Sequence, residues 1–111
     1  MYITNLNFGD TKPTEYDWGN SKKHVPLNVR ETSVIDEDGN KKIQYIGDLV
    51  EKVDMPITVD NIVKAAAIGK FGEDITYYVA ANIYKTNDPK IQEYTEFVKV
   101  ISAQAMEAGY K

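Results

Sequence analysis

Few residues of this chain have the type and spacing that catalysis requires. His24 is the only histidine, and no carboxylate lies beside it at the spacing of a metal ligand. We interpret it as a solvated or edge residue rather than a catalytic base or a metal ligand, because a lone histidine needs partners for either task. No serine lies in a G-x-S-x-G motif, so the sequence predicts no serine nucleophile that His24 could activate.

The acidic run Asp36-Glu37-Asp38-Gly39-Asn40 has the composition of a calcium-binding loop but not its spacing. An EF-hand loop needs glycine at its sixth position, whereas the glycine is the fourth residue counted from Asp36. We interpret the run as an acidic β-turn, because Asp-Gly and Gly-Asn readily adopt the left-handed conformations that turns use. A weak ion site formed between subunits is the alternative.

The other candidate groups also have structural explanations. Glu93 and Glu96 lie three residues apart on the polar face of a predicted helix, where a solvated surface accounts for them. The glycines occur singly, and the segment GKFGED lacks the spacing of a phosphate-binding loop. The sequence therefore predicts no catalytic residue, no cofactor and no metal site. This favours a protein that is not an enzyme.

Composition places the chain among ordinary globular proteins. It has 111 residues, of which 42% are apolar and 27% are charged, and it contains no cysteine. We predict one domain over residues 1–111, with a β-rich part at 1–55 and a helical part at 56–111. No apolar run approaches the roughly 20 residues that span a membrane, and the N-terminus lacks the features of a secretion signal, so neither is expected.

The negative charge of the chain is concentrated in its middle. The formal net charge is −4, and residues 31–60 carry eight acidic residues against three lysines. A phosphate backbone would be repelled by this segment and would find no basic stripe elsewhere. We therefore expect proteins as partners and no nucleic acid or membrane.

The segment from Val29 to Asp54 carries the clearest structural signal. Apolar and polar residues alternate on both sides of Asp38-Gly39-Asn40, which predicts a long β-hairpin with arms at about Val25–Ile35 and Lys42–Val53. A short strand is also predicted at Tyr2–Phe8.

The register of this hairpin depends on the length of its loop. A three-residue loop pairs Ile35 with Ile43, whereas a two- or four-residue loop pairs Val34 with Ile43. We prefer the three-residue loop because the face that it creates is richer in apolar residues. That face contains Leu27, Val29, Ile35, Ile43, Tyr45 and Leu49.

Three helices are predicted after Pro56. They span about Val59–Lys70, Glu73–Lys85 and Pro89–Ala108, each with apolar residues at helical spacing. Thr58 is a suitable N-cap for the first, and Asn-Asp-Pro begins the third. The predicted fold class is α+β, with an N-terminal antiparallel β-hairpin or small sheet packed on three C-terminal helices.

Aromatic residues give the candidate interface. Trp18 lies in a polar segment rich in turn signals, and we expect it to fold back and close one end of the core, because its large apolar surface is otherwise exposed. The alternative is an exposed aromatic platform for a sugar or a protein. The helices carry more tyrosines than a small core requires, which favours a contact surface. The candidate interface residues are Tyr16, Trp18, Tyr77 and Tyr84.

The order of these parts resembles a known group of proteins. The hairpin sequence VRETSVIDEDGNKKIQY is followed by the segment Met55–Phe71 and by the E-Y-x-x-F pattern at Glu93–Phe97. This arrangement is similar to small proteins encoded by tailed phages and prophages of gut Bacteroidales, over about residues 14–108. Gly72 departs from it, because Ser or another N-cap residue is expected there. The shared motifs are structural, so the resemblance transfers no functional residue.

The resemblance implies a virion or virion-assembly component. We expect a non-enzymatic structural or interaction protein of a tailed-phage virion, which docks on a capsid, tail or fibre component as a homo-oligomer or as part of a larger assembly. The alternative is a tail-fibre assembly chaperone that is not retained in the virion. The expected location is the virion, or the host cytoplasm during assembly.

Overall fold

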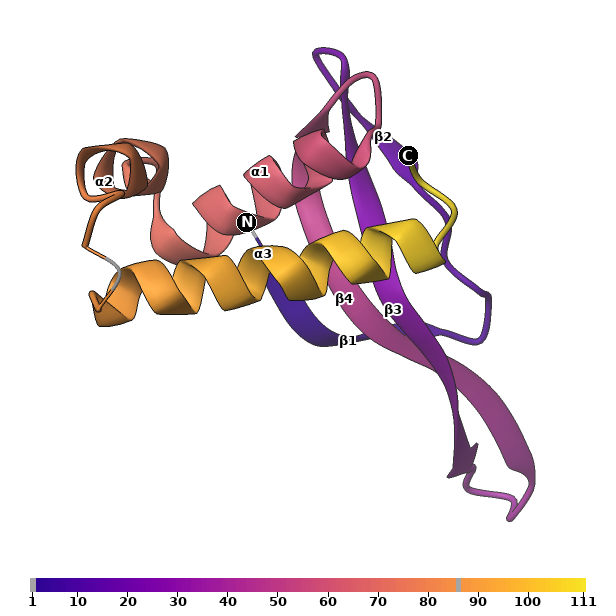
Figure 1. Cartoon of the computed structure of the whole chain (residues 1–111). Coiled ribbons are helices and arrows are strands. Elements are labelled where there is room, and N and C mark those ends of the chain that lie inside the picture. The colour runs from indigo at the N-terminus through magenta and orange to yellow at the C-terminus, as the bar shows by residue number, and fades with distance from the viewer. Residues whose placement is uncertain (1, 86) are drawn as a thin grey trace.

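The computed structural model describes residues 2–85 and 87–111, which form a sheet with helices on one face (Figure 1). The elements in chain order are β1 (Tyr2–Gly9), β2 (Tyr16–Gly19), β3 (Lys22–Ile35), β4 (Lys41–Asp54), α1 (Val59–Phe71), α2 (Ile75–Ala81) and α3 (Pro89–Glu107). The strands make one antiparallel sheet of four, in the order β1-β4-β3-β2. The predicted α+β class is confirmed.

Part of the polar segment that is rich in turn signals forms a short strand, β2. Gly19, Asn20 and Ser21 all have positive φ, at 109°, 51° and 58°. These conformations make a tight turn that folds β2 back onto β3, and Tyr16 consequently pairs with His24. The turn-forming residues therefore make the turn of a short hairpin between β2 and β3.

Both predicted registers of the long hairpin are wrong. Ile35 pairs with Lys41 and Ser33 pairs with Ile43, so the loop comprises the five residues 36–40. The side chain of Asp36 explains this loop length, because its Oδ1 accepts hydrogen bonds from the backbone N–H groups of Asp38 at 3.0 Å and Asn40 at 2.8 Å. The acidic run therefore uses a carboxylate to close its own turn.

Irregular positions along the hairpin also divide the predicted apolar face. The register shifts between Leu27 and Arg30, where Asn28 has a φ of 52°. Leu27 then lies on the face that carries the core, whereas Leu49 pairs with Pro26 on the opposite face. The preferred three-residue loop would also pair Arg30 with an aspartate, but Arg30 pairs with Ile46.

That aspartate, Asp48, is only 6% exposed and lies on the helix side of the sheet. It accepts hydrogen bonds from the hydroxyl of Tyr2 at 3.4 Å and from the backbone N–H of Asn5 at 3.1 Å. Burial, followed by the charge of Asp48, raises the pKa of Tyr2 to about 12. The carboxylate therefore holds β1 against β4.

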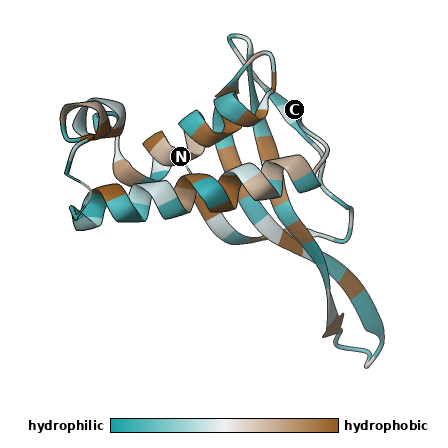
Figure 2. Ribbon diagram, viewed as in Figure 1, coloured by the Kyte–Doolittle hydropathy of each residue, from teal (hydrophilic) through white to brown (hydrophobic). Residues whose placement is uncertain are grey.

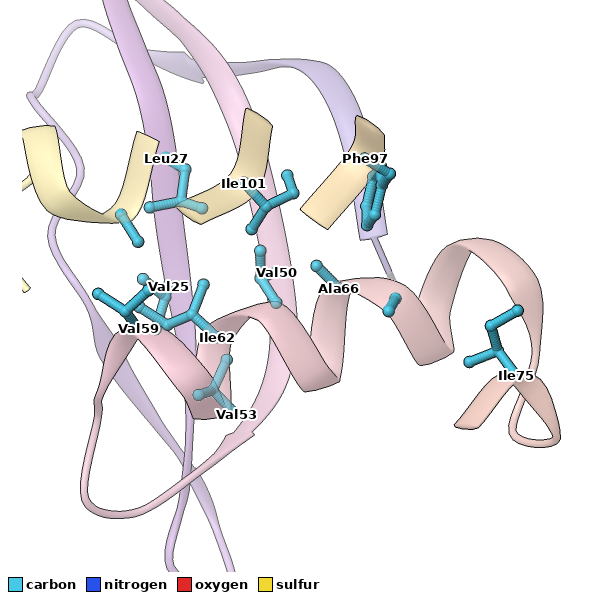
Figure 3. Close-up of a cluster of buried hydrophobic side chains, with 12 residues drawn as sticks. Val25, Leu27, Val50, Val53, Val59, Ile62, Ala66, Ile75, Phe97 and Ile101 are labelled. Carbon is cyan, nitrogen blue, oxygen red and sulfur yellow. The ribbon is translucent and has the colours of Figure 1, made fainter. Parts of the chain in front are cut away.

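The core lies between the sheet and the helices α1 and α3 (Figure 3). Val25 and Val50 face each other across β3 and β4 and are fully buried. Ile62 from α1 and Ile101 from α3 are also fully buried against them, and each such side chain contributes about 1.5–3 kcal/mol by leaving water. Tyr2 packs edge-on against Phe97, which joins β1 to α3.

The helices begin where their caps predict. Thr58 caps α1 by accepting a hydrogen bond from the N–H of Asn61 at 3.2 Å, and Asp88 caps α3. The second helix is shorter than predicted. It ends at Ala81 because the side chain of Asn82 bonds back to the carbonyl of Tyr78 at 2.8 Å. No helix within the described residues is long and apolar enough to cross a membrane.

The distal part of the hairpin, Glu31–Tyr45, extends away from the helices, and we call it the arm (Figure 1). It is a two-stranded ribbon, because β1 reaches only as far as Tyr45 along β4 and β2 pairs only with the first residues of β3. Figure 2 shows isolated apolar residues along it. Ile35 is 72% exposed and Ile43 is 53% exposed, so both contribute little to the core.

Candidate binding surface around His24

His24, which we expected to be a solvated or edge residue, is in fact buried in a strand that is paired on both sides. His24 is 2% exposed and lies on the face of the sheet opposite to its neighbour Val25, which belongs to the core. Its Nδ1 accepts a hydrogen bond from the backbone N–H of Lys52 at 3.1 Å. Its Nε2 lies 3.4 Å from a carboxylate oxygen of Glu51. In the neutral ring the proton therefore resides on Nε2, facing that carboxylate.

A backbone irregularity makes this contact with Lys52. The register of β3 and β4 shifts around His24, and Lys52 has a φ of 60°. The extra residue in β4 leaves the N–H of Lys52 without a strand partner opposite it, and the imidazole accepts its hydrogen bond instead. The histidine is thus a structural part of the bulge.

Two aromatic side chains from β2 cover the imidazole. The ring of Trp18 stacks on His24 with centroids 4.6 Å apart and planes at 23°, and the ring of Tyr16 meets it edge-on at 5.1 Å. Trp18 is nevertheless 54% exposed and Tyr16 is 48% exposed. The expectation that Trp18 closes the core is therefore wrong, because β2 directs it to the face of the sheet that the helices do not cover.

Charged groups frame these rings. The ammonium of Lys52 lies 5.8 Å from the centroid of Trp18, within cation–π range, and Glu51 is beside the imidazole. We call the surface formed by Tyr16, Trp18, His24, Glu51 and Lys52 the aromatic surface. It offers two half-exposed aromatic rings with one acidic and one basic group beside them.

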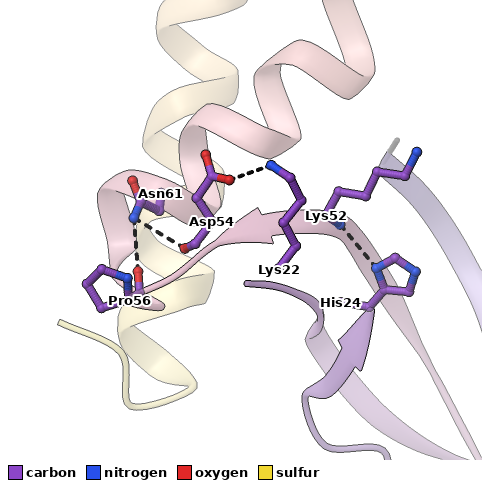
Figure 4. A network of polar contacts seen from close by, with 6 residues as sticks. All are labelled: Lys22, His24, Lys52, Asp54, Pro56 and Asn61. Carbon is purple, nitrogen blue, oxygen red and sulfur yellow. Dashed lines mark hydrogen bonds and ion pairs between the residues drawn. The ribbon is translucent and has the colours of Figure 1, made fainter. Parts of the chain in front are cut away.

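A polar network fixes the strands next to this surface (Figure 4). Lys22 bonds to the carboxylate of Asp54, which holds the pKa of Asp54 below its usual range. The side chain of Asn61 donates to the carbonyls of Asp54 at 3.3 Å and Pro56 at 2.9 Å. The end of β4 is thereby tied to α1, so the aromatic surface is held on a rigid base.

The other two candidate interface residues lie elsewhere. Tyr77 and Tyr84 are 79% and 94% exposed, in and just after α2. Figure 1 shows α2 at the opposite end of the molecule from β2. The intervening Tyr78 instead donates a hydrogen bond to Asp88 at 2.6 Å, which fixes the turn into α3. The four predicted residues therefore make two separate exposed patches.

A groove of about 540 Å³ lies between residues 12–15, the strand segment Pro26–Val29 and the end of α3. At its edge, Glu15 accepts hydrogen bonds from Tyr110 at 2.6 Å and Lys23 at 3.1 Å. These two donors lower the pKa of Glu15 below its ordinary value. Gln104 is among the residues that line the groove. Its Oε1 is buried and accepts no hydrogen bond from any described residue.

The arrangement around His24 is suited to stacking and hydrogen bonding. Within residues 2–85 and 87–111, no group of three or more His, Cys, Asp or Glu side chains is placed to hold a metal ion. Of the acidic pair Glu93 and Glu96 on α3, Glu93 lies 3.9 Å from Lys70 in an ion pair.

Sequence reasoning missed the role of His24. The sequence feature that indicates this role is the turn Gly19-Asn20-Ser21. If these residues form a tight hairpin turn, alternate residues of β2 and β3 lie on one face, and Tyr16, Trp18 and His24 come together.

Comparison with known proteins gives no relative for this chain. No family model, no curated protein and no solved structure matches it.

Proposed function

We propose that this chain is a non-enzymatic structural protein of a tailed-phage virion, and that it docks on a capsid, tail or fibre protein through the aromatic surface. The observation that carries the docking proposal is the stack of Trp18 on the buried His24, with centroids 4.6 Å apart. A half-exposed tryptophan held on a rigid partner loses little conformational freedom on binding, and tryptophan and tyrosine are the preferred anchors of protein interfaces.

The chemistry of the surface supports a protein partner. Trp18 and Tyr16 supply apolar area with polar tips, and Lys52 and Glu51 supply one charge of each sign at the edge. Interfaces commonly have such an aromatic centre and a charged rim. The assignment to a phage particle rests on the resemblance of residues 14–108 to proteins of Bacteroidales phages.

The test is the protein content of purified particles of the phage that encodes the chain. Mass spectrometry is expected to find the chain in stoichiometric amounts relative to a known structural protein. Particles made with the Trp18→Ala variant should contain at least about tenfold less of it, because removal of an anchor costs about 2 kcal/mol or more. Lys99→Ala, an exposed position of α3 on the opposite side of the sheet, serves as the control.

Two results would count against the proposal. Absence from mature particles, together with a raised yield of a fibre protein on co-expression, would indicate an assembly chaperone instead. Normal incorporation of the Trp18→Ala variant would show that docking does not use the aromatic surface.

A further inference from the structure

We infer that two copies of this chain pair through the arm, with the outer edges of β3 side by side around a two-fold axis and each turn seated in the groove of the other copy. This interface is separate from the aromatic surface, and it goes beyond the proposed docking on another protein.

The first observation is the free edge of β3. Within the described residues β2 pairs only with Lys22–His24, so no strand lies along the outer edge of β3 from Val25 to Ile35. The arm is also only two strands wide. Two-stranded ribbons are marginally stable alone, and an uncovered edge is a template for another strand.

The second observation is that the sequence of this edge complements itself. Around a two-fold axis at Thr32, antiparallel pairing places Thr32 opposite its own symmetry mate. Arg30 then faces Val34, and Glu31 faces Ser33. No like charges meet in this register, whereas centring on Arg30 or Glu31 would oppose identical charges. When the two-fold axis is perpendicular to the sheet, the residue numbers of paired residues differ by an even number. The side chains of the two strands therefore point to the same face at each pair.

The third observation is the position of the groove. The regular part of the edge ends at Arg30, where the bulge at Asn28 begins. Continuing the same register past that point brings Ile35 of one copy beside Val29 of the other, and Val29 and Asn28 both line the groove. The exposed Ile35 would therefore enter a ready-made hollow rather than remain 72% exposed.

The groove also matches the chemistry of the turn. The turn has three acidic residues and is followed by two lysines. The charged residues that line the groove are Lys12, Glu15 and Glu107, and Glu15 is already bonded to Tyr110 and Lys23, which leaves Lys12 and Glu107 as one group of each sign for the turn. Stable interfaces bury about 1,200 Å² or more, which requires the groove contact in addition to a short strand ladder.

The test is the mass of the purified full chain in solution. Sedimentation equilibrium is expected to give twice the chain mass of 12.5 kDa. The variants Thr32→Lys and Thr32→Glu should each shift the protein to the monomer and raise the dissociation constant about tenfold or more, because like charges then meet at the axis. A mixture of the two variants should restore the dimer, because opposite charges then meet there.

The groove contact has its own matched pair of variants. Ile35→Asp should weaken the dimer, whereas Ile43→Asp, also exposed but on β4, should leave it unchanged. A monomer at all concentrations would overturn the inference. A dimer that remains intact in both Thr32 variants would also overturn it. The same holds for a mixture of the two variants that fails to pair, provided that each variant unfolds at the urea midpoint of the wild type. Because these experiments use the purified chain alone, their outcome is independent of the virion experiment.

Discussion

The imidazole of His24 accepts a hydrogen bond from the backbone N–H of Lys52 at 3.1 Å, and this contact joins a bulge in β4 to the aromatic surface. The same ring carries Trp18 on one side. One buried side chain thus accepts the hydrogen bond of a backbone N–H in the bulge and also supports Trp18, the exposed residue that we propose as an anchor.

His24→Leu should lower the free energy of unfolding by about 2 kcal/mol, because the N–H of Lys52 loses its acceptor. His24→Asn is the matched control, since its Oδ1 can take the place of Nδ1, and it should cost about 1 kcal/mol less than the leucine variant. Urea unfolding of both proteins measures the difference. Equal costs for the two variants would show that the hydrogen bond does not contribute.

Gly47→Ala should be one of the most damaging substitutions in the sheet. An added Cβ would lie 2.9 Å from the carbonyl oxygen of Leu27 and 3.1 Å from the Cα of Val29, both backbone atoms that cannot move aside. We expect a loss of about 3 kcal/mol. Gly72→Ala is the control. Its φ of 96° is strained for alanine but the space around it is open, so its cost should be about 1 kcal/mol. Thermal unfolding of the two variants tests this order.

Glu15→Gln should remove a pH dependence of stability. The hydrogen bonds from Tyr110 and Lys23 hold the pKa of Glu15 below its ordinary value of 4.5. The folded state therefore favours the charged form, so the stabilisation is fully present above pH 4.5 and is lost as the pH falls through the lowered pKa. The difference in unfolding free energy between wild type and Glu15→Gln should shrink from about pH 5 to about pH 3. A constant difference over that range would contradict the assignment.

Tyr77→Ala and Tyr84→Ala should leave the fold intact, because the two side chains are 79% and 94% exposed. The free energy of unfolding should change by less than about 0.5 kcal/mol, whereas Ile101→Ala in the core should cost about 2–5 kcal/mol. If these tyrosines belong to a second docking patch, both variants should also enter virions less efficiently. Variants that unfold readily while incorporation per folded molecule is unchanged would exclude that role.

Local signals in the sequence located the regular elements well. Thr58 and Asp88 begin α1 and α3 where their capping side chains predict, and the alternation around the acidic turn predicted the long hairpin. These features depend only on interactions between residues a few positions apart, so they can be predicted from the local sequence. The early end of α2 was missed because it depends on a single back-bonded side chain, Asn82.

The register and the candidate site depended on contacts between distant parts of the chain. A five-residue loop closed by Asp36 and the shifts beside Leu27 and Lys52 changed which residues face the core. Such shifts move every later side chain of a strand relative to its partner, and alternation alone does not locate them. Ile35 and Ile43 were consequently predicted on a shared buried face, although both are exposed on the arm.

By itself, then, the sequence determined an α+β chain with a long acidic-tipped hairpin and three helices, two of which begin at side-chain caps, because helix caps and alternation are local properties. Only the tertiary structure decided that His24 is buried under Trp18, that the outer edge of β3 is free, and that a groove lies at the end of that edge. Each of these results from the pairing of strands with one another and the packing of α3 beside β3, whose geometry depends on residues far apart in the chain.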